Sequence, residues 1–110
     1  KVNRMKTFDF NVWMKEKHNI AHQNEFYTML HSVKCIDGFT ISVQASSGHY
    51  CQPRETGAYE YHMVECGYPS QFPDFILEYA EDSERPTDTV YGYVPVELVN
   101  KLINSHGGVL

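Results

Sequence analysis

The chain has 110 residues and a formal net charge of −5, and 42% of its residues are hydrophobic. This length suits one domain with one modest core, and this apolar fraction excludes a disordered chain. No apolar run approaches the ~20 residues needed to span a bilayer, and no leader resembles a secretion signal. We expect a single soluble domain over residues 1–110, with the first four residues, which precede Met5, left outside the fold.

Two helices are expected before the first glycine turn. Thr7 is placed to cap the first helix, in which Phe10, Trp13, Met14 and Lys17 fall on one stripe. The alternation of Phe8, Phe10 and Val12 fits a strand equally well. A second helical pattern covers Asn24–Val33, and Asp37-Gly38 marks a turn.

Two strands are expected on either side of a long polar loop. Phe39–Ala45 (FTISVQA) alternates between apolar and polar residues, which is typical of a half-buried antiparallel strand. Tyr59–Cys66 (YEYHMVEC) is its expected partner, with Tyr59, Tyr61 and Met63 toward the core and a bulge that shifts the register. The 13-residue connection Ser46–Ala58 (SSGHYCQPRETGA) is unusually long for a compact domain, and such loops tend to be functional.

The last part of the chain predicts a helix, a strand and a helix. The first of these helices has the apolar stripe Phe72, Phe75, Ile76, Tyr79 and Ala80. After a turn at Ser83–Asp88, Thr89–Val94 (TVYGYV) reads as a third strand, in which Gly92 marks either a bulge or the close approach of another backbone. Pro95 starts the final helix, and Gly107-Gly108 closes it with a glycine cap.

These elements predict an α+β fold in the order α-α-β-β-α-β-α. A small antiparallel sheet of about three strands, with the helices packed on one side, buries all the apolar stripes.

Acidic side chains concentrate in residues 55–97, which carry ten acids against Arg85 alone. Such a surface repels phosphates, so we expect no direct nucleic-acid binding. It either meets a basic protein partner or serves only to keep the protein soluble. The three cysteines (Cys35, Cys51, Cys66) are an odd number in a chain without a secretion signal, which favours reduced thiols over a Cys51–Cys66 disulfide.

Catalytic and metal sites have little support in the residue pattern. Zinc ligands are available at His49, Cys51, His62 and Cys66, but His62 and Cys66 would lie about 13 Å apart on a strand unless a bulge shortens the distance. A thiolate–imidazole pair of Cys51 and His49 lacks an orienting third group and an oxyanion hole. Phosphate-binding glycine motifs are missing from the sequence. We therefore predict no catalytic residue, metal or cofactor.

A recognition surface is the remaining reading of the loop. Tyrosine and arginine are frequent in binding hot spots, and acids of the following helix would lie nearby. The predicted partner-binding residues are His49, Tyr50, Arg54, Tyr59, Tyr61, Asp74, Glu78, Glu81 and Asp82. The alternative is that the tyrosines pack in the hairpin and Arg54 pairs with Glu55 or Glu60.

Two phrases carry a resemblance to known proteins. Ser46–Arg54 (SSGHYCQPR) and Pro86–Val99 (PTDTVYGYVPVELV), with His106-Gly107-Gly108 after it, resemble small uncharacterised proteins encoded by bacteriophages and mobile elements. The resemblance covers about the last two-thirds of the chain. Small acidic phage proteins of this type include anti-CRISPR and other anti-defence inhibitors, which bind a bacterial effector and block its nucleic-acid groove. This analogy rests on genomic company and charge.

The resemblance implies a phage-encoded, non-enzymatic inhibitor that binds a bacterial defence protein, such as a CRISPR effector with a basic groove, in the host cytoplasm. The alternative is a small enzyme or a metal- or ligand-binding protein that uses the His49/Cys51/Arg54 loop. A third reading is a self-associating accessory component, since the sequence does not define the oligomeric state.

Overall fold

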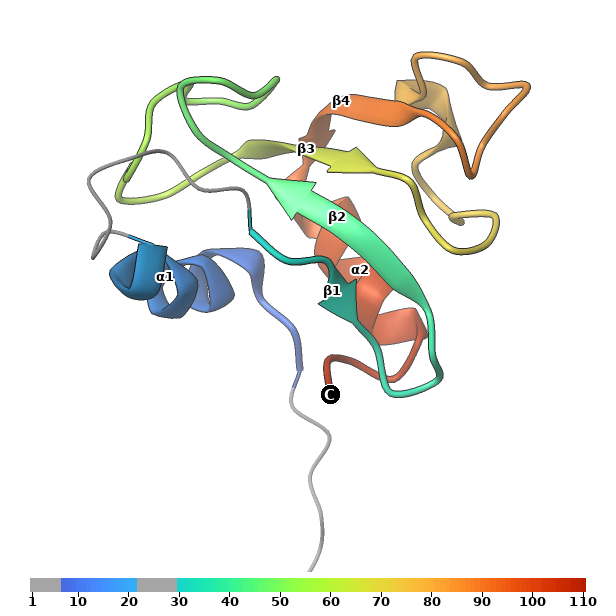
Figure 1. The fold of residues 1–110 in the computed structure, drawn as a ribbon, viewed down its shortest axis with the longest axis horizontal. Helices are drawn as coiled ribbons and strands as arrows, with labels where there is room; N and C mark the ends of the chain where they lie inside the picture. The colour runs from blue at the N-terminus through green and yellow to red at the C-terminus, as the bar shows by residue number, and fades with distance from the viewer. Residues whose placement is uncertain (1–6, 22–29) are drawn as a thin grey trace, which may run out of the picture.

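A four-stranded antiparallel sheet in the order β1-β2-β3-β4 is the centre of the fold (Figure 1). The computed structural model describes residues 7–21 and 30–110. In chain order, the elements are α1 (Phe10–Ala21), β1 (Val33–Lys34), β2 (Thr40–Gln44), β3 (Met63–Gly67), the 3-10 helix η1 (Leu77–Tyr79), β4 (Val90–Pro95) and α2 (Val96–Ser105). The expected α+β class is confirmed, with four strands in place of about three.

The core lies between the sheet and α2, which passes behind β2 in Figure 1. The apolar face predicted for the first long strand is confirmed, because Phe39, Ile41, Val43 and Ala45 are all buried. Gln44, expected on the polar face, is also buried and exchanges hydrogen bonds with the backbone of Leu30. Helix α2 buries Val99, Leu102 and Ile103. Helix α1 packs beside α2 and buries Phe10 and Met14. Among the described residues, no helix is long and apolar enough to cross a membrane.

Both edges of the sheet are covered by extended segments of the same chain. At one edge, residues 108–110 lie along β1, where Ile36 N donates to Gly108 O (3.0 Å) and Leu110 N donates to Lys34 O (3.0 Å). At the other edge, Ala80 forms a β-bridge with Tyr91 of β4. The predicted glycine cap is confirmed, since Gly107 and Gly108 have φ of 92° and 82° and return the chain to β1.

The helix expected over residues 72–80 does not form. Only the short η1 is helical there, Phe72 and Phe75 are exposed, and Phe75 has a left-handed φ of 75°. The segment instead becomes extended at Ala80 and pairs with β4, so its backbone hydrogen bonds go to the sheet edge. Helical spacing of apolar residues cannot reveal that an edge strand needs a partner.

Three further boundaries differ from the prediction. Asp9 caps α1 in place of Thr7, because its Oδ1 accepts a hydrogen bond from Val12 N (3.2 Å). The helix predicted over 24–33 lies mostly outside the described residues, and its last residue, Val33, belongs to β1 and pairs with Ile41. Strand β3 begins at Met63, later than expected.

Side-chain amides connect the helices to the rest of the fold. Asn104 of α2 accepts from Phe8 N (2.7 Å) and donates to Phe8 O (3.0 Å), and Asn100 accepts from Phe10 N (2.8 Å). Asn11 of α1 repeats this pattern, since it accepts from Tyr61 N (2.8 Å) and donates to Tyr61 O (3.0 Å). Each amide therefore replaces a missing backbone partner.

We predict that Asn104→Ala lowers the free energy of unfolding by about 2 kcal/mol, because two part-buried backbone groups of Phe8 lose their partners. Urea denaturation measures the loss. Asn104→Asp is the matched control, since it keeps the acceptor for Phe8 N but cannot donate to Phe8 O. It should lose an intermediate amount, and an alanine variant as stable as the wild type would contradict the prediction.

Candidate functional site

The long loop between β2 and β3 is attached to the sheet at Tyr50. The backbone N of Tyr50 donates to Glu65 Oε1 on β3 (2.9 Å), and its carbonyl accepts from Tyr93 N on β4 (3.0 Å). Gln52 forms a β-bridge with Met63 directly after it. The peptide groups around Tyr50 are therefore fixed by both β3 and β4.

A β-bulge in β4 makes room for this attachment. Val64 pairs with Val94 and Cys66 with Tyr91, which leaves Gly92 and Tyr93 opposite Glu65 alone. A Cβ added to Gly92 would lie 3.3 Å from Cβ of Tyr50. Of the two readings of Gly92, the bulge is confirmed, and the group that approaches this glycine is the side chain of Tyr50 instead of another backbone.

Two tyrosines and an arginine meet on the surface above the bulge. The rings of Tyr50 and Tyr93 lie 5.8 Å apart at an angle of 35°, and the guanidinium carbon of Arg54 lies 5.3 Å from the Tyr50 ring centre. Tyr50 and Tyr93 keep 45% and 44% of their surface exposed. We call Tyr50, Arg54 and Tyr93 the tyrosine cluster.

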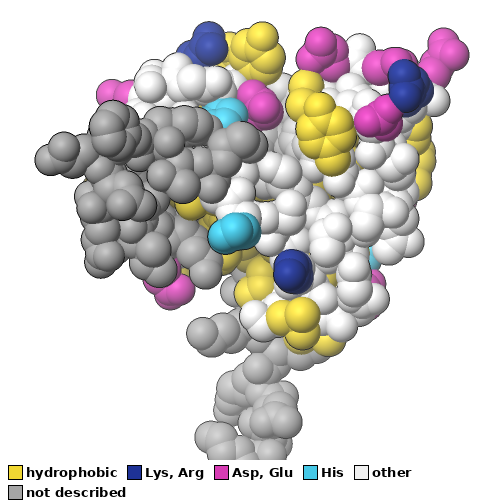
Figure 2. Space-filling model, viewed as in Figure 1, with side chains coloured by type: hydrophobic (Ala, Val, Ile, Leu, Met, Phe, Trp, Pro, Cys, Tyr) yellow, Lys and Arg dark blue, Asp and Glu magenta, His cyan; other side chains and the backbone are white. Residues whose placement is uncertain are grey.

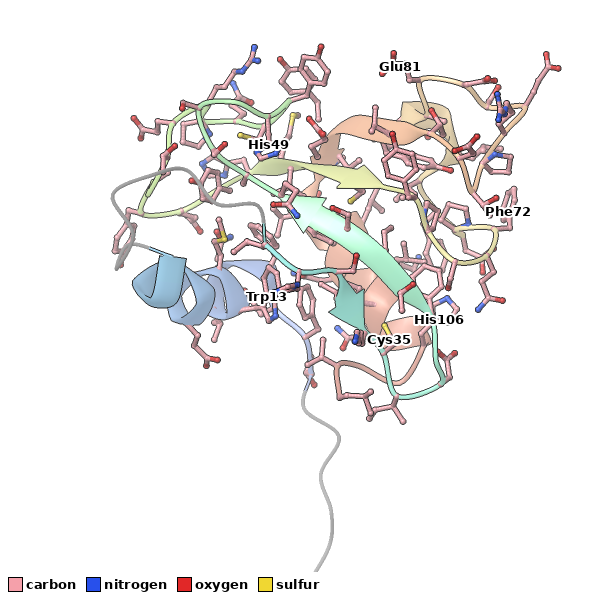
Figure 3. All side chains as sticks on the ribbon, in the orientation of Figure 1. Trp13, Cys35, His49, Phe72, Glu81 and His106 are labelled. Carbon is pink, nitrogen blue, oxygen red and sulfur yellow. The ribbon has the colours of Figure 1, made fainter. Side chains whose placement is uncertain are left out.

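Exposed acids lie on and before the segment that covers the outer edge of the same strand. Glu81 N donates to Val90 O (2.9 Å) and Asp82 N donates to Thr89 Oγ1 (3.0 Å), so the backbone of this segment is fixed to β4. Figure 2 shows acidic side chains gathered at the end of the molecule where Figure 3 labels Glu81. We call Asp74, Glu78, Glu81 and Asp82, all exposed, the acidic segment. The neighbouring Glu84 is also exposed and was not predicted.

Three of the predicted contact residues lie elsewhere. His49 is only 7% exposed and Tyr61 only 2%, so neither side chain presents a surface to a partner. The hydroxyl of Tyr61 donates to Glu55 O (2.7 Å) inside the loop. Tyr59, expected to face the core, is 85% exposed, and Lys15 of α1 lies over its ring at 4.5 Å.

His49 is part of the interior of the loop (Figure 3). Its Nδ1 lies 2.8 Å from Ser46 Oγ, which also accepts from Gly48 N (3.0 Å). Burial lowers the pKa of His49, against the opposing effect of the Glu65 carboxylate and with the aid of the Arg54 charge. The neutral imidazole therefore belongs to the folded state of the loop.

The thiols are also unsuited to catalysis. Cys35, Cys51 and Cys66 are free and buried. Burial raises the pKa of Cys51, whose Sγ donates to Ser46 O (3.2 Å), and raises the pKa of Cys35 to about 11. A raised pKa keeps each thiol protonated and poorly nucleophilic at neutral pH.

The candidate zinc ligands do not converge. His62 is exposed, whereas Cys66 is buried in the core. Among the described residues, no three His, Cys, Asp or Glu side chains form a group that could hold a metal ion.

Sequence reasoning missed Tyr93 and Glu65, the two residues that complete the attachment of the loop. Tyr93 had one visible signal, since the Tyr-Gly-Tyr pattern of residues 91–93 places tyrosines on both sides of a glycine that admits another residue. Glu65 had none, because its contact with Tyr50 depends on how the loop folds back over β3.

We predict that the protein loses stability as the pH falls through about 6.5, the ordinary pKa of an unfolded histidine. The pKa of His49 is lower in the folded state, so the unfolded chain binds the proton more readily and unfolding becomes easier at acid pH. Urea denaturation across this range should show a smaller loss for His49→Gln. An equal loss in both proteins would rule out His49 as the cause.

We also predict that iodoacetamide labels none of the three cysteines quickly in the native protein, because each thiol is buried. All three should react after denaturation in guanidinium. Mass spectrometry of the labelled peptides identifies the sites. Rapid native labelling at Cys51 alone would instead favour the enzyme alternative.

The comparisons with known proteins give no relative. No protein-family model matches the chain, and no curated protein and no solved structure is significantly similar to it. The function of the chain therefore has to be inferred from the chemistry of its own residues.

Proposed function

We propose that this protein is a non-enzymatic inhibitor, encoded by a phage, that binds a bacterial defence protein through the tyrosine cluster and the acidic segment. A CRISPR effector with a basic nucleic-acid groove is the proposed class of partner. The phage origin is proposed from the sequence resemblance of residues 46–54 and 86–99 alone, since the comparisons give no relative, and the charge of the surface supports a basic partner.

One observation carries the proposal: the tyrosine cluster and the acidic segment are both attached to the backbone of β4. Tyr93 N binds Tyr50 O, and three residues earlier Val90 O binds Glu81 N. Aromatic contact area and negative charge are thus held close together on one strand. Aromatic anchors provide affinity at protein interfaces, while surrounding charges steer the encounter and select the partner.

The attachment of the loop also favours binding. A loose loop of this length would lose conformational entropy when a partner orders it, which weakens affinity. Here Tyr50 is already held through both of its backbone polar groups and packs against Gly92. The tyrosine cluster is therefore preorganised for contact.

The enzyme alternative has less support. Its three residues differ in environment, because His49 and Cys51 are buried whereas Arg54 is exposed and lies over Tyr50. A small substrate would have to reach an imidazole and a thiol that the loop covers.

We predict that the immobilised protein captures a stoichiometric partner from a lysate of a CRISPR-carrying bacterium at low salt and releases it at high salt. The Debye length falls from about 10 Å at 0.1 M to about 3 Å at 1 M, so contacts made by exposed carboxylates weaken steeply. Neutralising the acidic segment (Asp74→Asn, Glu78→Gln, Glu81→Gln, Asp82→Asn) should abolish capture, as should Tyr50→Ala.

The matched control neutralises exposed acids outside the acidic segment, with Glu16→Gln, Glu60→Gln and Glu97→Gln, and should leave capture intact. The purified partner should also lose its nucleic-acid binding when the inhibitor is added. Recovery of no partner, or equal recovery with both sets of variants, would refute the proposal.

A further inference from the structure

Tyr93 has a backbone conformation that tyrosine rarely adopts. Among the described residues, three residues other than glycine have positive φ, namely Tyr68 (51°), Phe75 (75°) and Tyr93 (53°). All three are exposed aromatics. The left-handed region crowds the Cβ of a bulky side chain, so glycine or asparagine is expected there. Such strain, when observed at an exposed residue, suggests that its side chain has a function.

The residue next to Tyr93 is a glycine, yet the left-handed conformation falls on the tyrosine. The bulge contains Gly92, yet Gly92 is not the residue with positive φ. Its small size has another use, because a Cβ added at Gly92 would lie only 3.3 Å from the Cβ of Tyr50, which is a tight contact. At Gly92, the bulge lets Tyr50 pack against β4. At Tyr93, it holds a tyrosine in a conformation in which glycine would be less strained. Both features serve to place two tyrosine rings together.

We infer that Tyr93 is kept in this conformation because its ring, with that of Tyr50, receives an arginine side chain of the partner, so that the surface prefers arginine to lysine. This inference rests on the proposed function and adds the chemical group that the tyrosine cluster recognises.

The contacts inside the protein indicate the preference. The tyrosine cluster already holds one guanidinium, that of Arg54, 5.3 Å from the centre of the Tyr50 ring. A planar guanidinium stacks on an aromatic face and still donates hydrogen bonds to carboxylates at its edge, which an ammonium group cannot do equally well. The carboxylate of Glu65, whose Oε1 accepts from Tyr50 N (2.9 Å), lies beside the tyrosine cluster and is such an acceptor.

Lysines of this chain contact single rings elsewhere. Lys15 lies 4.5 Å from the ring centre of Tyr59, and Lys101 lies 4.4 Å from that of Phe75. A single exposed ring therefore accepts an ammonium group. The paired rings of Tyr50 and Tyr93 offer a larger aromatic surface, which suits the flat guanidinium.

The test compares oligoarginine and oligolysine peptides of equal length and charge, with binding to the full chain measured by calorimetry. The wild type should bind oligoarginine about fivefold more tightly than oligolysine. Tyr93→Ala and Tyr93→Gly should both lose this preference, and Tyr93→Phe should keep it. Tyr59→Ala removes an exposed tyrosine outside the cluster and should leave the preference unchanged.

Thermal unfolding separates recognition from a structural role. Tyr93→Gly should melt at a higher temperature than Tyr93→Ala, because both lack the ring and only glycine relieves the left-handed strain. Equal affinity of the wild type for the two peptides, or a preference that persists without the Tyr93 ring, overturns the inference while leaving an acidic docking surface intact. The variant whose acidic segment is neutralised should bind both peptides more weakly than the wild type does. If the wild type binds neither peptide more tightly than this variant, the proposed function is overturned as well.

Discussion

Hydrogen bonds from asparagine side chains to isolated backbone segments are the interaction on which this structure depends. Asn104 of α2 holds Phe8 through both of its backbone polar groups, and Asn11, at the start of α1, holds Tyr61 in the same way. The hydroxyl of Tyr61 then binds Glu55 O and Ala58 N, at the far end of the long loop. Hydrogen bonds thus join α2 to Phe8 and, separately, Asn11 to the end of the loop, and the covalent backbone of residues 8–11 connects the two sets. Buried backbone groups demand such partners, and here side-chain amides provide them.

Strand β4 positions both groups of exposed side chains that form the candidate site. Its inward side chains, Tyr91 and Val94, are fully buried, while its bulge and its outer edge hold the tyrosine cluster and the acidic segment. The groups that could perform chemistry lie beneath that surface, where burial keeps His49 neutral and Cys51 protonated. Exposed aromatic and acidic side chains therefore lie over buried polar groups, and this arrangement is the basis of the recognition role that we propose.

Local periodicity predicted the parts of the fold that local contacts determine. The alternation of residues 39–45 and the apolar stripe of α2 each describe one face against one core, and both are present. The helix predicted from the apolar stripe at residues 72–80 does not form, because Ala80 pairs with Tyr91 of β4. This contact depends on where the edge of the sheet lies. Tyr50, Arg54, Tyr59 and the acids are exposed, as a recognition surface requires, and their role in binding stays a prediction. Tyr93 was missed because its position depends on the bulge in β4. His49 and Tyr61 were wrongly placed on the surface, because the burial of the loop depends on distant partners such as Asn11.

The covered edges of the sheet have a consequence for behaviour at high concentration. Unpaired strand edges are sites where an abundant, β-rich protein is at risk of joining strand to strand into fibrils. Residues 108–110 and the stretch at Ala80 occupy the two positions where a second chain would add. Addition of a strand from a second copy at either position would first require the chain's own segment to move away from the sheet.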